Sequence, residues 1–224
     1  MNILPVGIYG PYPGAGFATN CFVVDNGKAK IVLDMGSGAL STLKKYCKLD
    51  EIDAYIFSQL HFDHFCDILP LSYTGKERKV YCPAGPQEFY SLLKNHTSFR
   101  LGSIDKDSTI SIGGMKITFS PVVHPIETYS IKISEGDKFF VYTSDTVWFD
   151  GLPQLVKGAS LVLADCTSRA RTPHMTPYEG AKLRELSGVK RIIGVHMNPD
   201  YDCQAECSLL GIEMVKEGKV IKAW

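Results

Sequence analysis

The stretch FSQLHFDHFCD, residues 57–67, places two histidines and two aspartates directly after the apolar segment DAYIF at 53–57. Such a run of aromatic and β-branched residues predicts a strand, and sheet proteins build active sites from the polar residues that follow their strands. In the turn after a strand, side chains one and two positions apart point to different sides. We therefore expect His61 to face one metal ion, and Asp63 and His64 to face a second ion beside it.

Three more potential ligands end predicted strands further along the chain: His124, Asp145 and His196. Each alone would be interpreted as a turn residue, but together with the first group they predict one cage of imidazoles and carboxylates. Such ligands suit zinc, iron or manganese. Two ions about 3.5–4 Å apart would clamp a bridging water and lower its pKa toward about 7. The sequence therefore predicts a metal-activated hydroxide at neutral pH.

Strands and helices alternate around these residues. Helices are predicted at 39–47, 86–95, 177–186 and 204–216, and the third begins with the capping box Thr176–Glu179 and with Pro177. Strands are predicted at 3–9, 19–24, 30–33, 54–57, 108–112, 115–119, 130–133, 138–142, 161–164, 191–195 and 220–224. Hairpins in the middle and strand–helix alternation after residue 160 predict an α/β fold with packed sheets and outer helices.

Length and composition indicate an ordinary globular protein. The 224 residues can bury one core, so we expect a single domain spanning residues 1–224. Zero net charge argues against a protein that grips long nucleic acid or an anionic membrane. No apolar run approaches the roughly 20 residues that span a bilayer, and the amino terminus lacks a leader pattern. We expect a cytoplasmic protein that acts on a small molecule.

The cysteines and glycines carry weaker signals. Seven irregularly spaced cysteines without a Cys-x-x-Cys pair indicate neither a disulfide framework nor a cysteine zinc site. The loop at 10–16 contains Gly14 and Gly16 two positions apart, but no third glycine follows them and no helix begins there, so we interpret it as a flexible surface loop rather than a dinucleotide site. Aromatic residues around this loop could line the pocket or form a homodimer contact: Tyr9, Tyr12 and Phe17.

The motif Gln59-x-His61-x-Asp63-His64 lies between the segment DMGSG at 34–38 and the later residues His124, Asp145 and His196. In order and spacing, this pattern resembles the metallo-β-lactamase superfamily over residues 20–200. The segment LADCT at 163–167, followed by His174 at a helix start, resembles the ribonuclease Z-like branch, including its small bacterial metallohydrolases.

The resemblance implies a metallo-β-lactamase-like αββα four-layer sandwich with the metal ions at one edge of the two sheets. The implied ligands are His61 and His124 for the first ion, Asp63, His64 and His196 for the second, and Asp145 as the bridge. It also implies that Asp34 orients the ligand loop and that His174 donates a proton to the leaving group. We assign catalytic roles to Asp63 and His174; the alternative for His174 is a plain residue at a helix start.

Gln59 departs from the family pattern, which has histidine at this first ligand position. An amide carbonyl can bind a cation, but it is a weaker donor for zinc than imidazole. We expect one or two zinc ions, with Mn²⁺ or Fe²⁺ as other candidates, and a weaker first site. Gln59 could ligate directly or through water, the first site could stay largely empty, or turnover could be lost. We favour retained hydrolysis, because the other ligand positions and His174 are intact.

The expected substrate is a small phosphodiester, as the ribonuclease Z-like resemblance implies. The 59 residues between His64 and His124 already hold predicted helices and strands, which leaves little room for the long arm with which those nucleases hold transfer RNA. The alternatives are a carboxylic ester or lactone hydrolase, a mononuclear iron oxygenase, and a non-catalytic metal-binding protein. β-Lactam hydrolysis is disfavoured because the sequence shows no export signal.

Overall fold

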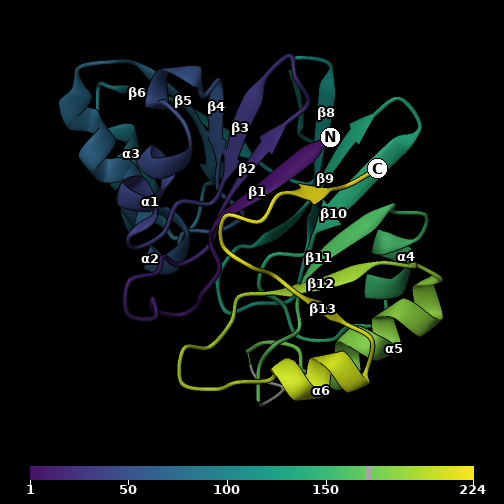
Figure 1. Cartoon of the computed structure of the whole chain (residues 1–224). Helices are drawn as coiled ribbons and strands as arrows, with labels where there is room; N and C mark the ends of the chain where they lie inside the picture. Colours follow the sequence, from purple (N-terminus) through teal and green to yellow (C-terminus); the bar gives the residue numbers. More distant parts are fainter. Residues whose placement is uncertain (170–172) are drawn as a thin grey trace.

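The computed structural model describes residues 1–169 and 173–224, and within them two mixed β-sheets pack face to face (Figure 1). The first sheet has the strand order β14–β1–β2–β3–β4–β5–β6. Its strands are Ile221–Lys222 (β14), Asn2–Gly7 (β1), Cys21–Asp25 (β2), Lys30–Leu33 (β3), Ala54–Ile56 (β4), Arg78–Pro83 (β5) and Phe99–Ile104 (β6).

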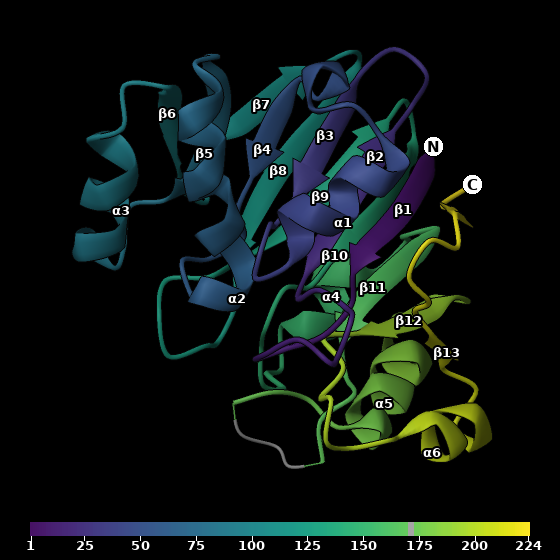
Figure 2. The ribbon, with the colours of Figure 1, turned by 60° about the vertical axis from the view of Figure 1, so that its left-hand side comes forward.

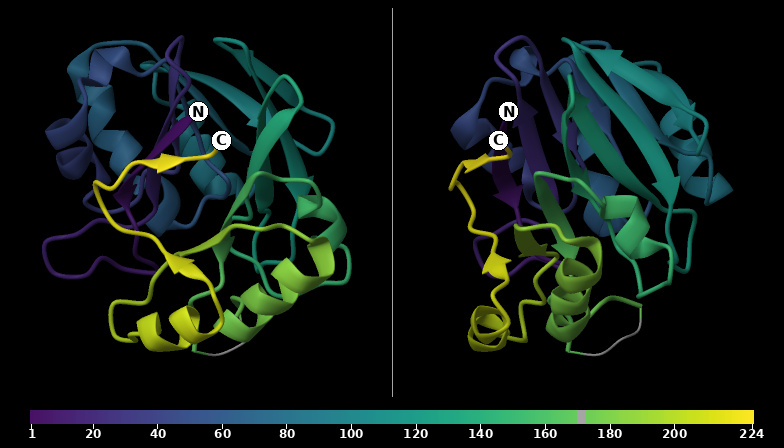
Figure 3. Two further views of the ribbon diagram at one scale, coloured as in Figure 1. Left: turned by 45° about the vertical axis from the view of Figure 1, so that its right-hand side comes forward. Right: turned by 90° about the vertical axis from the view of Figure 1, so that its right-hand side faces the viewer.

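The second sheet has the strand order β13–β12–β11–β10–β9–β8–β7. Its strands are Glu213–Met214 (β13), Ile192–Val195 (β12), Leu161–Asp165 (β11), Lys138–Tyr142 (β10), Tyr129–Glu135 (β9), Met115–Pro121 (β8) and Thr109–Ile112 (β7). The carboxy-terminal segment, yellow in Figure 3, passes from β13 in this sheet to β14, which pairs with β1 in the first sheet. This crossing ties the two sheets together.

The helices lie on the outer faces of the sandwich (Figure 2). The first sheet carries α1 (Ala39–Tyr46), α2 (Phe62–Phe65) and α3 (Gln87–Lys94), with the 3₁₀ helices η1 (Leu49–Glu51) and η2 (Cys66–Thr74). The second sheet carries α4 (Leu152–Val156), α5 (Pro177–Ser187) and α6 (Gln204–Leu209). Across the described residues, no helix combines the length and the apolar content that crossing a membrane requires.

Central strands are buried on both faces, which explains why they read as apolar runs rather than as alternating patterns. In β2, Phe22 packs between the sheets and Val23 packs toward the outer helices. In β10, Tyr142 packs between the sheets and Val141 packs toward the outer helices. The layers therefore run helix, sheet, sheet, helix, and the predicted αββα sandwich is confirmed.

The structure differs from the sequence prediction at several elements, and η1, β5, α4 and β13 are among those that the prediction lacks. The prediction contains neither β6 nor the helical segment from α2 to η2; β6 is an edge strand whose polar residues and glycine hide its strand pattern. The helix predicted at 204–216 is wrong beyond Leu209. Gly211 has a φ of +67°, which breaks the helix, and Glu213–Met214 instead pair with β12.

The residues that follow β3, β4, β10 and β12 contact one another, so the carboxyl ends of these strands meet at one edge of the sandwich. At three of these ends a non-glycine residue has a positive φ: Asp34 at 54°, Ser144 at 57° and His196 at 61°. This conformation costs about 1–3 kcal/mol per residue and tends to occur at functional sites. The backbone is therefore strained where the candidate ligands gather.

Candidate metal centre

Four of the predicted ligands form a buried cluster, here called the second half-site: Asp63, His64, Asp145 and His196. One ligand atom from each lies within 4.8 Å of the others. His196 Nε2 is 3.1 Å from Asp63 Oδ2, and His64 Nε2 is 3.0 Å from Asp145 Oδ2. The cluster can therefore offer two imidazoles and two carboxylates to one cation.

The first half-site consists of His61 and His124 together with the same carboxylate, Asp145. His124 Nε2 lies 3.2 Å from His61 Nδ1 and 3.8 Å from Asp145 Oδ2. Folding thus brings the histidines and aspartates named as ligands into one place. The division between the half-sites follows the spacing of the sequence motif, with His61 on one side and Asp63 and His64 on the other.

Gln59 is fully buried against the shared carboxylate. Its amide nitrogen donates to Asp145 Oδ2 over 2.7 Å and lies 3.0 Å from His64 Nε2. Its amide oxygen is also buried and finds no hydrogen-bond partner in the described part of the chain. An unpaired buried carbonyl costs about 1–3 kcal/mol, so a cation would be a fitting partner for it. Gln59 therefore holds Asp145 through its amide nitrogen, and its buried amide oxygen is the atom left to bind a cation.

Asp34 orients His64, one of the ligands of the second half-site, through a buried hydrogen bond. Its Oδ2 accepts hydrogen bonds from His64 Nδ1 at 2.8 Å, Tyr142 OH at 2.7 Å and Ser58 Oγ at 2.9 Å. Its Oδ1 accepts the backbone N–H of Ser58 at 2.8 Å. Because His64 Nδ1 is engaged in this way, its Nε2 is free to face the cluster, which is how carboxylates orient histidine ligands.

His174 lies beside the second half-site and stacks on His196, with ring centroids 4.6 Å apart. His174 Nδ1 is 2.8 Å from Asp165 Oδ2, which also accepts the backbone N–H of Thr146. Burial lowers the pKa of His174, but the charge of Asp165 and its hydrogen bond outweigh burial and raise the pKa overall. His174 therefore holds a proton more firmly than an ordinary imidazole.

Asp165 was not predicted as a site residue, although its position at the end of a strand could have indicated one. It ends the apolar strand β11, just as Asp145 and His196 follow β10 and β12. Its hydrogen bond with His174 joins residues nine positions apart, and no local pattern encodes that contact.

Electrostatics keep the carboxylates of the cluster ionised. Burial raises the pKa of Asp63, but His64 and His196 outweigh burial and lower the pKa. Burial likewise raises the pKa of Asp145, yet the same two histidines hold it well below the usual range. In the first half-site, burial lowers the pKa of His124 to about 4, which leaves the imidazole neutral at pH 7. Asp63, Asp145 and His124 are thus in the ionisation states that bind a cation. Burial lowers the pKa of His64 and of His196, but the carboxylates outweigh burial and raise it, so metal binding there would release their protons.

The donor set fits a transition-metal ion. Buried carboxylates are costly unless they are paired or bind a metal. None of the described residues that line the adjoining cleft is lysine or arginine, so only histidines balance the negative charge there. Three or four nitrogen and oxygen donors suit zinc, and the buried second half-site offers the fuller set.

The half-sites open into a cleft of about 400 Å³. Its lining residues are Pro11, His61, Phe62, Asp63, His124, Asp145, Pro173, His174 and His196. The loop at 10–16 lies largely at the surface, as expected, and its Pro11 also lines this cleft. A Cβ atom added to Gly10 would lie 2.0 Å from His196 Nε2, so glycine at this position allows the loop to approach the imidazole.

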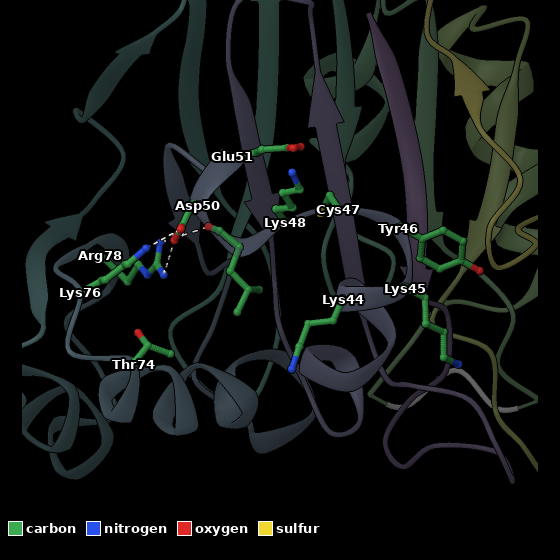
Figure 4. A pocket seen from close by; sticks show the side chains of 11 residues that line it. Lys44, Lys45, Tyr46, Cys47, Lys48, Asp50, Glu51, Thr74, Lys76 and Arg78 are labelled. Carbon is green, nitrogen blue, oxygen red and sulfur yellow. Dashed lines mark hydrogen bonds and ion pairs between the residues drawn. The ribbon is translucent and has the colours of Figure 1, made fainter.

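A larger hollow, of about 710 Å³, lies at the opposite end of β4. Figure 4 shows Asp50 of this hollow joined to Lys76 and Arg78, with Lys44 and Lys45 pointing away from them. Lys44 and Lys45 occupy the last turn of α1, where cations favour the helix dipole. These charges have structural explanations, and the chemistry-bearing side chains lie in the smaller cleft.

Known proteins resemble the chain in sequence. The profile of the Beta-lactamase superfamily domain matches residues 30–197. The probable metallo-hydrolase YhfI of Bacillus subtilis (strain 168) is 27% identical over 212 residues, which cover 88% of this chain and 87% of YhfI. The matched region contains the candidate metal ligands, from the Gln59 motif to His196.

Solved structures share the fold. The metallo-β-lactamase fold protein YhfI from Bacillus subtilis has a TM-score of 0.91 at 24% identity, covering 98% of each chain. A diphosphatase from the PhnP family has a TM-score of 0.81 at 18% identity, covering 98% of this chain and 96% of the other. The human tRNase Z short form has a TM-score of 0.77 at 18% identity, covering 100% of each chain. With the profile match and the clustered donor set, the chain belongs to the β-lactamase superfamily and is one of its metallo-hydrolases.

Proposed function

We propose that this metallo-hydrolase cleaves a small phosphodiester. The observation that supports the proposal is the Asp165–His174 pair beside the second half-site. Cleavage of a phosphodiester expels an alkoxide or aryloxide, which needs a proton, and a protonated imidazole at the metal cleft can provide it. The names of two structural neighbours, tRNase Z and diphosphatase, agree with chemistry at phosphorus.

In this proposal, the ion of the second half-site is held by Asp63, His64, Asp145 and His196. An ion of the first half-site would be held by His61, His124 and the shared Asp145, with Gln59 as a further ligand. When bound, the metal polarises the phosphoryl group and lowers the pKa of a bound water. Asp63 lines the cleft and is held ionised, so it can accept a proton from the attacking water. Asp165 holds His174 through Nδ1, which leaves Nε2 as the nitrogen that serves the leaving group.

A carboxylic ester or lactone hydrolase is the second candidate. It is favoured by the absence of lysine and arginine among the described cleft residues, because a neutral ester needs no cationic side chain. The two candidates differ in the substrate that the same centre would turn over.

The test is His174→Gln in the zinc-loaded full chain, measured with bis-p-nitrophenyl phosphate and with a phenyl phosphodiester. We expect kcat to fall about 10²–10⁴-fold, the range typical of a lost general acid. The loss should be larger for the phenyl substrate, because phenolate is a poorer leaving group than p-nitrophenolate. Zinc content, measured by elemental analysis, should stay unchanged because His174 is not a ligand.

His96→Gln is the matched control, since His96 lies two residues after the end of α3 and is not among the residues that line the cleft. Turnover of p-nitrophenyl acetate and γ-butyrolactone in the same series separates the second candidate from the first. A fully zinc-loaded wild type that hydrolyses the ester or the lactone but no phosphodiester would refute the proposal.

A further inference from the structure

Phe62 is an exposed aromatic side chain at the metal cleft. It stands between His61 and Asp63 in the sequence, lines the cleft, and leaves 59% of its surface accessible. Single exposed apolar side chains are ordinary on protein surfaces, so exposure alone would carry no meaning. Here the ring borders the place where a substrate must sit to reach the ligands of both half-sites.

Two further rings hold Phe62 in position. Phe65, fully buried in the same helix α2, lies with its centroid 5.8 Å away and its plane inclined by 22°. Phe89 of α3 contacts Phe62 with centroids 5.0 Å apart and an interplanar angle of 56°. Phe65 and Phe89 also contact each other at 5.7 Å. Because the ring is already fixed on one side, little conformational entropy is lost when a ligand packs on the exposed side.

The remainder of the cleft favours a ligand with few charges. Pro11 and Pro173 add apolar surface, and the described lining includes no lysine or arginine. Phosphomonoesters and polyphosphates bring two or more negative charges, which proteins commonly meet with arginine and lysine. A diester brings one charge, which the metal centre itself can meet. A volume of about 400 Å³ suits a small molecule.

We propose that Phe62 is a stacking platform for an aromatic substituent of the substrate, so that the substrate is an aryl-bearing phosphodiester with a single negative charge. This inference rests on the proposed function and names its substrate class. Aromatic rings pair in offset or tilted arrangements with centroids about 4.5–7 Å apart, the range in which Phe62 already meets Phe65 and Phe89. Stacking of this kind changes affinity by about tenfold per ring.

The experiment measures the dissociation constants of diphenyl phosphate and diethyl phosphate by calorimetry on the zinc-loaded full chain. Wild type should bind diphenyl phosphate about tenfold more tightly than diethyl phosphate. Phe62→Ala should lose most of this preference, with the affinity for diethyl phosphate unchanged within about twofold. Phe62→Leu keeps apolar volume for Phe65 and Phe89 and should lose about threefold, since only the aromatic contact is removed.

Tyr73→Ala is the matched control, because Tyr73 is an aromatic residue that is 91% exposed and does not line the cleft. It should keep the wild-type preference. Thermal melting of each variant checks folding, and Phe62→Leu carries the test if Phe62→Ala does not fold. Equal affinity of wild type for the two phosphates, or an unchanged aryl preference in Phe62→Leu and Phe62→Ala, would overturn the inference.

Turnover separates this inference from the proposed function. Diester hydrolysis by wild type without any aryl preference in binding would overturn the platform and leave the proposed function standing. An aryl preference that depends on Phe62, without hydrolysis of any diester, would support the platform and overturn the proposed function.

Discussion

The two half-sites share one carboxylate, Asp145, but differ in their other donors. The second half-site offers two imidazoles and two carboxylates from buried residues. The first offers two imidazoles and the shared carboxylate, with His61 only half-buried. Position 59, where the family pattern has an imidazole, carries the amide of Gln59. Ligand type alone therefore predicts a tight second site and a weaker first site.

The surroundings of the ligands strengthen this contrast. In the second half-site, His64 Nδ1 is bound by Asp34, which fixes the ring and makes it a better ligand. In the first half-site, His124 Nδ1 is buried and finds no partner among the described residues. One motif can therefore build two sites of unequal strength when a single position and its supporting contacts change.

The largest expected effect comes from Asp145→Asn, which removes the carboxylate that both half-sites share. A catalytic metal ion supplies several kcal/mol of transition-state stabilisation, so turnover should fall about 10³-fold or more. Elemental analysis should find less than about a tenth of an ion per chain after dialysis, because the first half-site loses its only carboxylate and the second loses one of its two.

Asp150→Asn is the control for this change, since Asp150 is an exposed aspartate five residues later. It should keep wild-type metal content and activity. If Asp145→Asn retained one zinc ion per chain, the two half-sites would not both depend on the Asp145 carboxylate.

A smaller effect, confined to the second half-site, is expected for Asp34→Asn. Asparagine tolerates the left-handed backbone of position 34, where φ is 54°, so the fold should be kept. The amide oxygen of asparagine is a weaker hydrogen-bond acceptor for His64 Nδ1 than the carboxylate. Loss of such a contact typically lowers metal affinity by about 10–100-fold. Zinc titration against a competing chelator measures this loss directly. Unchanged zinc affinity would show that Asp34 supports the fold rather than the ligand.

The smallest effect is a gain at the first half-site, expected for Gln59→His. Imidazole is the better zinc donor, so the number of zinc ions retained per chain should rise from about one to about two. Gln59→Leu, which removes the amide without adding a donor, should stay at about one ion. If the wild type retains two ions with equal affinity, the contrast between the half-sites is wrong.

Much of this site can be predicted from short-range patterns. Each candidate ligand comes shortly after an apolar strand in the chain, and the spacing of His61, Asp63 and His64 divides them between the half-sites. These features are legible because strand burial and side-chain alternation act over a few residues. The end of α6 was predicted wrongly, because pairing of Glu213–Met214 with β12 outweighs the local helical preference.

The sequence by itself determined the layer order and the identities of the candidate ligands, because a fully buried strand must be apolar and a metal ligand must carry a donor atom. The family resemblance had named Asp34 as a residue that orients the ligand loop, but only the tertiary structure decided which atom each supporting residue contacts. Asp34 meets His64, Asp165 meets His174, and the Gln59 amide meets Asp145 across gaps of 30, 9 and 86 positions. Contacts of this kind depend on how strand ends converge at one edge of two sheets, and no local pattern in the chain encodes that convergence.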